Sequence, residues 1–169
     1  EAMWSIGTSM LTVIMGHMAN SQDMLAAYAL IGSIDKLSTV VCFGIAASAA
    51  VIVGKEIGQG RDKEHVFSVS WTLLLVSMFV GAFVMVLLLV LLPTFFRPVL
   101  FPLFKLSPGA TQAAVYLAVV YALFMPMRSF DITNITGVLR AGGDGKMASI
   151  IDITPLWLVA IPLMAVAAL

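Results

Sequence analysis

Residues 121–152 read YALFMPMRSFDITNITGVLRAGGDGKMASIID, and this stretch decides the fold. An apolar run contains Arg128, Asp131 and Asn134 at three-residue steps, and a second apolar run begins at Met147 after a Gly-rich segment. Residues three apart on a helix are neighbours, so the three polar groups should form an oblique row along one side. Ionisable groups inside apolar helices are costly and usually face protein or a water-filled cavity rather than lipid. The stretch therefore predicts two apolar helices whose polar groups need an explanation.

The composition of the whole chain indicates a membrane protein. The chain has 169 residues, of which 61% are hydrophobic and 11% are charged, whereas a soluble domain carries roughly 25% charged residues. The formal net charge is zero, so the basic excess typical of a nucleic-acid binder is missing and no nucleic-acid partner is expected. The single cysteine, Cys42, lies in an apolar context and reads as a small core residue.

Five segments reach or approach the roughly 20 apolar residues that a membrane helix needs. They are residues 1–19, 24–54, 66–92, 109–139 and 147–169. Open sheets cannot satisfy their backbone groups in lipid. The sequence therefore predicts an all-α, polytopic membrane helix bundle with five transmembrane helices, spanning 1–169 as one unit. Because the chain opens and closes inside apolar segments and lacks an initiator Met, we expect it to be a fragment of a longer membrane protein.

The segments between the spans differ in character. Residues 55–65, KEIGQGRDKEH, form the most charged run and predict a loop. Residues 93–108 combine four prolines with several phenylalanines, which favours an irregular connector lying at the membrane interface. Pro126, in the middle of the fourth span, predicts a kink.

The basic residues predict the orientation. One set of loops carries Lys55, Arg61, Lys63, Arg140 and Lys146, and the other carries Arg97 and Lys105. Cytoplasmic loops of membrane proteins are enriched in Lys and Arg. We therefore expect residues 55–65 and 140–146 to face the cytoplasm.

A few intramembrane charges are the candidates for function. Asp35 lies inside the second span beside Lys36, and a structural ion pair and an ion-binding role are equally open for it. Asp131 could be neutralised by Arg128 one turn earlier, although the nearby Pro126 favours a functional role because kinked helices often line cavities. Asp152 lies near the edge of its span, where an interfacial role is the better interpretation.

Catalytic motifs are missing from the sequence. It contains no HExxH, no GxSxG, no phosphate-binding loop and no Cys/His cluster with metal-binding spacing. The chain is therefore not expected to be an enzyme. Helices with a few intramembrane carboxylates fit a secondary transporter or a channel.

Several ordered segments resemble multidrug and toxic compound extrusion (MATE) transporters. They are EAMWSIGT (1–8), AAY (26–28), AAVIVGKEIGQGR (49–61), GVLRAGGD (137–144), IID (150–152) and residues 157–162. Their order and spacing cover essentially the whole chain. Any one of these motifs is loose, but the ordered set is fairly specific.

The resemblance implies helices seven to eleven of a twelve-helix transporter, that is, a partial C-terminal lobe. It implies antiport in which Na⁺ or H⁺ drives the export of drugs or other amphipathic or cationic compounds across the plasma membrane. The expected partners are a small-molecule substrate, membrane lipid and the missing N-terminal lobe. No cofactor other than the coupling ion is expected.

The resemblance also implies roles for particular residues. Glu1 matches an acid early in helix seven that many members use for cation coupling, and Asp35 falls where a subset has an acid in helix eight. The usual helix-ten acid falls at Ser129 rather than at Asp131, and two helical residues differ by about 200° in direction. The predicted cation-coupling and substrate-cavity residues are Glu1, Tyr28, Asp35, Arg128, Asp131 and Asn134, with a possible Na⁺ site at Glu1 and Asp131.

Two alternatives remain open at this point. Related folds also flip or export lipid-linked precursors, which requires a basic cavity for phosphate head groups. Only Lys36 and Arg128 lie deep in the spans, so this alternative has thin support. A non-transporting membrane scaffold is the second alternative, and the intramembrane charges argue against it.

Overall fold

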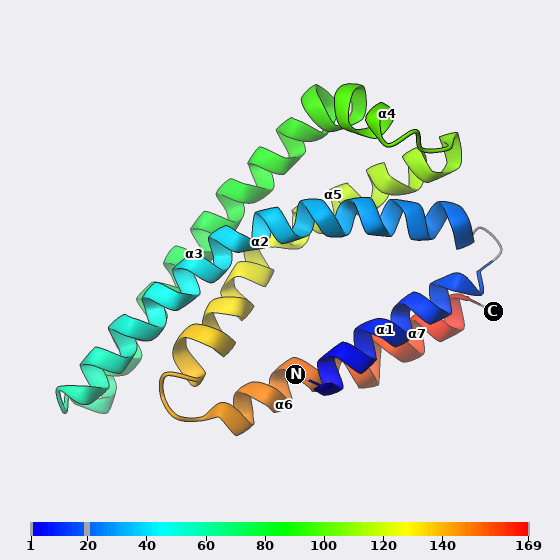
Figure 1. The fold of residues 1–169 in the computed structure, drawn as a ribbon. Helices are drawn as coiled ribbons and strands as arrows, with labels where there is room; N and C mark the ends of the chain where they lie inside the picture. Colours follow the sequence, from blue (N-terminus) through cyan, green and yellow to red (C-terminus); the bar gives the residue numbers. More distant parts are fainter. Residues whose placement is uncertain (1, 19–20, 169) are drawn as a thin grey trace.

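The computed structural model describes residues 2–18 and 21–168, and every regular element in these ranges is helical. The α-helices are α1 (Ala2–Gly16), α2 (Ser21–Gly58), α3 (Lys63–Leu91), α4 (Phe101–Leu103), α5 (Pro108–Ile132), α6 (Gly145–Pro155) and α7 (Ile161–Ala167). Three π-helical segments join them: η1 (Leu92–Leu100), η2 (Thr133–Leu139) and η3 (Leu156–Ala160). The prediction of an all-α membrane bundle is confirmed (Figure 1).

Four of these helical stretches are long and apolar enough to cross a membrane. They are Ser21–Gly58, Lys63–Leu103, Pro108–Leu139 and Gly145–Val166. The first predicted span corresponds to α1, which is apolar but has 15 residues. Glu1, at the start of that span, lies outside the described residues.

The predicted irregular connector at 93–108 is wrong over its first part, because η1 and α4 continue the helix through Leu103. Pro93 and Pro102 are the second residues of η1 and α4, and Pro98 lies inside η1. The helical path therefore accommodates three of the four prolines of the connector. Phe101 is 1% exposed and packs with Leu92 and Ala114, which holds the segment on the bundle. Figure 1 shows the ribbon bending here and running across the end of the bundle toward α5.

The charged loop is also shorter than predicted. Helix α2 runs to Gly58 and α3 begins at Lys63, so only residues 59–62 separate them, and Gly60 makes the turn with a φ of 69°.

At the opposite end of α2, the side chain of Ser107 connects α2 to α5 by two hydrogen bonds. Its hydroxyl accepts from the Ala110 N–H (3.0 Å) as the cap of α5 and donates to the Asp23 carboxylate (2.5 Å).

Helix α5 with η2 packs against both α2 and α3, and small residues allow the backbones to approach closely. A Cβ added at Gly81 would lie 2.8 Å from the Met125 carbonyl oxygen, and one at Gly137 would lie 2.9 Å from that of Ala46. Such contacts are typical of helices packed in lipid, where van der Waals complementarity replaces the hydrophobic effect. They set the register that brings the candidate site residues together.

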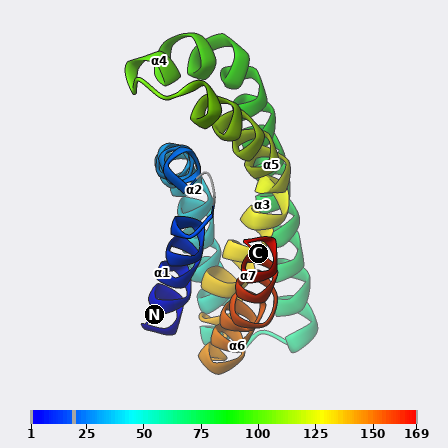
Figure 2. The same cartoon turned by 90° about the vertical axis from the view of Figure 1, so that its right-hand side faces the viewer.

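Helix α1 packs against η3 and α7, whereas α3 and α5 pack against each other. The Trp157 indole N–H donates to the Met3 carbonyl at 3.2 Å, and Gly7 lies directly against Leu156. Figure 2 shows α1 and α2 along one side of the molecule, with α3, α5 and α7 along the other.

Candidate functional site

Asp35 of α2 and Arg128 of α5 form an ion pair between two membrane-spanning helices. Arg128 Nη2 lies 3.1 Å from Asp35 Oδ2. Arg128 also donates through Nη1 to the Tyr121 hydroxyl, and its Cζ lies 5.0 Å from the centre of the Tyr121 ring. Tyr121 and Arg128 are seven residues apart, so two helical turns place them on one face of α5. Three side chains thus form a single polar cluster.

The Asp35 carboxylate is only partly satisfied. Its side chain is 14% exposed and that of Arg128 is 37% exposed. Within the described part of the chain, Asp35 Oδ2 accepts from Arg128, whereas Oδ1 is buried and has no hydrogen-bond partner. An unsatisfied buried acceptor is costly. A proton or a water molecule bound at Oδ1 would therefore relieve this penalty.

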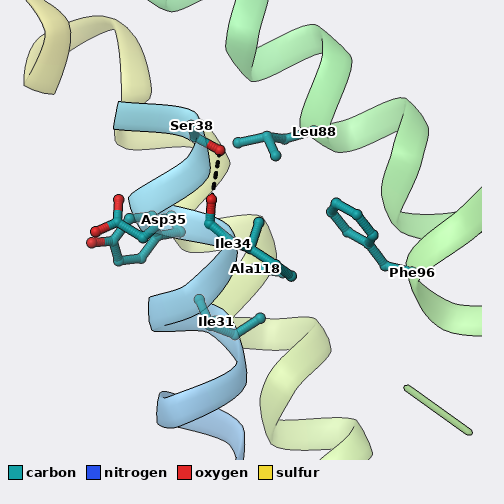
Figure 3. Close-up of a pocket in the computed structure, with 8 residues that line it drawn as sticks. Ile31, Ile34, Asp35, Ser38, Leu88, Phe96 and Ala118 are labelled. Atoms are coloured by element: carbon teal, nitrogen blue, oxygen red, sulfur yellow. Dashed lines mark hydrogen bonds between the residues drawn. The ribbon is translucent and has the colours of Figure 1, made fainter. Parts of the chain in front are cut away.

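A small cavity adjoins this carboxylate. Its volume is about 10 Å³, the size of a single water molecule. Figure 3 shows Ile34, Leu88 and Phe96 grouped on the cavity side, whereas the Asp35 carboxylate points away from them. The ion pair therefore lies at the edge of the apolar packing rather than at its centre.

Asp131 is not part of this cluster. Arg128 forms its ion pair with Asp35 rather than with its neighbour in sequence, so the self-neutralising arrangement is not observed. Asp131 is exposed, and it lies close enough to Arg128 and to Asp152 of α6 to interact electrostatically with both. Two carboxylates therefore approach each other where η2 meets α6.

Ser129, the position matched to the family's helix-ten acid, faces a different direction. It is fully buried, and its Cβ lies 2.7 Å from the position that a Cβ on Gly81 of α3 would take. Its hydroxyl has no hydrogen-bond partner among the described residues. A buried Ser129 beside an exposed Asp131 agrees with the predicted difference in direction.

The remaining predicted site residues are dispersed. Tyr28 lies two turns before Asp35 and is 39% exposed. Asn134 lines a second, larger cavity between α3 and η2. The structure therefore unites Asp35 and Arg128 but brings neither Tyr28 nor Asn134 to them.

The sodium site predicted at Glu1 and Asp131 stays a prediction, because Glu1 lies outside the described residues. In residues 2–18 and 21–168, no three His, Cys, Asp or Glu side chains gather to hold a metal ion.

Sequence reasoning missed Tyr121 and did not place Asp152 near Asp131. The signal for Tyr121 was its spacing of seven residues from Arg128, which places an aromatic hydroxyl on the face of the guanidinium. The proximity of Asp131 and Asp152 required the fold, because a Gly-rich turn separates the two helices.

The family model described as MatE matches residues 2–166 of the chain. The comparison with curated proteins and the comparison with solved structures gave no match.

Proposed function

The chain belongs to the MatE family of membrane transporters, and from this premise we propose that it is part of a secondary antiporter. Inward movement of Na⁺ or H⁺ would drive the export of drugs or other amphipathic or cationic compounds. The membrane would be the plasma membrane, which the chain crosses several times. The Asp35–Arg128 ion pair is the observation that carries this proposal.

The ion pair joins α2 to α5 through a charge-dependent contact. Protonation of Asp35 removes the negative charge, so Arg128 loses its partner and the free energy of the α2–α5 contact changes. A conformational equilibrium shifts only when a ligand binds its two states differently. A proton meets that condition if it binds Asp35 more tightly when α2 and α5 have moved apart and Arg128 no longer contacts the carboxylate.

At Asp35 a proton suits the geometry better than a metal cation. Arg128 already holds one carboxylate oxygen, so a Na⁺ bound there would lie beside a guanidinium and be repelled. The unpartnered Oδ1 can accept a proton without displacing Arg128 first. Sodium remains the alternative coupling ion at Glu1 and Asp131.

Family membership and the exposed Asp131, near the C-terminal end of α5, support the proposed cargo. Asp131 lies near Asp152, and two neighbouring carboxylates create a negative potential that attracts a cationic group. Apolar helix faces on either side suit the hydrophobic part of an amphipathic compound.

Export of lipid-linked precursors has less support. That activity requires a cluster of unpaired positive charge deep in the spans for a phosphate. Asp35 neutralises Arg128, which leaves Lys36, exposed on α2, as a single basic group. Asp131 adds negative charge nearby. A non-transporting scaffold has no need for a partly satisfied carboxylate between two helices.

Transport measurements on the intact transporter in proteoliposomes test the proposal. Asp35→Asn removes the carboxylate of the proposed coupling site, so we expect ion-driven export of a fluorescent organic cation to fall about tenfold or more. Asp62→Asn makes the same chemical change in the exposed 59–62 segment, where the side chain forms no cap hydrogen bond, and should leave transport unchanged.

The double variant Asp35→Asn/Arg128→Gln separates coupling from structure. If the pair serves only structure, removing both charges should restore transport, because no unpaired buried charge remains. We expect the double variant to stay inactive or to lose its dependence on the ion gradient. Restored, gradient-driven transport would contradict the coupling role.

A further inference from the structure

The second cavity lies at the basic end of the bundle and is much larger than the one beside Asp35. Its volume is about 670 Å³, within the range of ligand-binding pockets. Residues from the C-terminal end of α2, the first three turns of α3, the end of α5 and both ends of η2 line it. The turn at 59–62 contributes Arg61 and the turn after η2 contributes Gly142, so both loops meet at this cavity.

The walls of this cavity are apolar and face outward from the helices. Phe67 and Trp71 of α3 are 70% and 49% exposed, and Val138 and Leu139 of η2 stand opposite. Trp71 packs edge-on against Phe130, with ring centres 6.2 Å apart. Aromatic side chains near the ends of membrane helices are typical of the boundary between head groups and acyl chains.

Two basic side chains line the mouth of the cavity. Arg61 and Lys63 line it and are exposed, and no acidic side chain is among the described residues of the lining. Glu56 approaches Arg61 at 3.7 Å from outside the lining, and Asp62 and Glu64 flank Lys63 in the sequence. These three acids reduce the local positive charge, but none of them lines the cavity. Inside, the Asn134 amide offers a hydrogen-bond donor and an acceptor.

We infer that this cavity is a binding site for an anionic phospholipid of the adjacent leaflet. The phosphate would lie between Arg61 and Lys63, and the acyl chains would run along Phe67, Trp71 and Leu139. Basic pockets between membrane helices are known to suit anionic head groups. A lining whose charged groups are Arg61 and Lys63 disfavours the cationic cargo proposed above, so this site goes beyond the transport function and is occupied by a resident lipid.

Quenching of Trp71 fluorescence by brominated lipid measures occupancy directly. The intact transporter is placed in phosphatidylcholine nanodiscs that contain a small fraction of brominated phosphatidylglycerol or, separately, of brominated phosphatidylcholine. The contribution of Trp71 is the difference between the wild type and Trp71→Phe. Selective binding predicts several-fold stronger quenching by phosphatidylglycerol at the same fraction.

Charge variants then test the mouth of the cavity. Arg61→Gln/Lys63→Gln should weaken the apparent affinity for phosphatidylglycerol about tenfold, and each single variant should weaken it by a smaller factor. Arg97→Gln/Lys105→Gln removes the same charge from the opposite basic residues and should leave Trp71 quenching unchanged. Glu56→Gln should strengthen binding a few-fold, because it removes the acid beside Arg61.

Three results would overturn the inference. Equal quenching by the two brominated lipids would mean that Trp71 meets only the bulk bilayer. An equal loss in the Arg97→Gln/Lys105→Gln variant would indicate general charge attraction. Unchanged quenching in Arg61→Gln, Lys63→Gln and their combination, with the proteins folded by circular dichroism, would remove the proposed phosphate contact.

Discussion

The Tyr121 hydroxyl is the part of the ion-pair cluster that can be removed with the least disturbance. Tyr121→Phe keeps the ring under the guanidinium but deletes the oxygen that accepts from Arg128. We expect the apparent free energy of unfolding in mixed micelles to fall by about 1 kcal/mol, the usual value of one such hydrogen bond. Titration with a denaturing detergent, followed by circular dichroism, measures the change.

Tyr116→Phe is the matched control, since Tyr116 lies on the same helix and is 65% exposed. It should change the free energy of unfolding by less than about 0.5 kcal/mol. Equal losses in the two variants would show that the Tyr121 hydroxyl has no specific role at the site.

At the residue scale, the sequence identified Asp35 and Arg128 as candidates but not as partners. Helical spacing relates neighbours within one helix, so it predicts that Arg128 pairs with Asp131. The actual partner is 93 positions away in sequence. That pairing depends on how far α5 is shifted along α2, a distance that packing sets and that no local pattern contains.

The Gly137 contact lies against α2 and limits this shift, and the Gly81 contact fixes α5 against α3. The packing of the elements therefore depends on a few positions without side chains. At Gly81 an added Cβ would meet the Met125 carbonyl and the Pro126 Cα, both backbone atoms that cannot rotate away. We expect Gly81→Ala to destabilise the bundle by about 1–3 kcal/mol, the usual effect of overpacking, and to lower transport because α5 carries Arg128. Detergent unfolding and the transport assay measure the two effects.

Gly44→Ala provides the contrast, because nothing lies within 4 Å of a Cβ added there. In a helix interior alanine is favoured over glycine by roughly 0.5–1 kcal/mol, so this variant should be neutral or slightly more stable. A Gly81→Ala protein as stable as Gly44→Ala would mean that α3 and α5 do not approach as closely as described.

The elements themselves were largely predictable, and their ends were not. Long apolar runs specify membrane helices because each backbone group must be bonded within its own segment. The prolines in η1 and α4 predict an irregular connector from their usual effect, but the helix continues through them, Pro98 inside η1 included, and the burial of Phe101 holds the segment on the bundle. Tertiary contact decides such cases, so composition alone gives the wrong boundary.

Across the whole molecule, the basic residues separate by end. Arg61, Lys63, Val138 and Gly142 line one cavity, which places the 59–62 turn and the turn after η2 at the same end. The alternation of loops along the sequence predicted this grouping. The side of the membrane that this end faces is predicted only by the statistical preference for basic residues in cytoplasmic loops.

Cysteine labelling determines that orientation. Cys42 is the only cysteine of the chain and is fully buried, so it should remain unlabelled. In sealed right-side-out vesicles, a membrane-impermeant maleimide should label Lys105→Cys but not Gln59→Cys or Lys146→Cys. Detergent should make all three reactive, because all three positions are exposed.

Labelling of Gln59→Cys and Lys146→Cys in sealed vesicles would show that the topology is the reverse of the predicted one and would place the proposed lipid site in the outer leaflet. A split result, with only one of the two labelled, would contradict the shared end that the cavity requires.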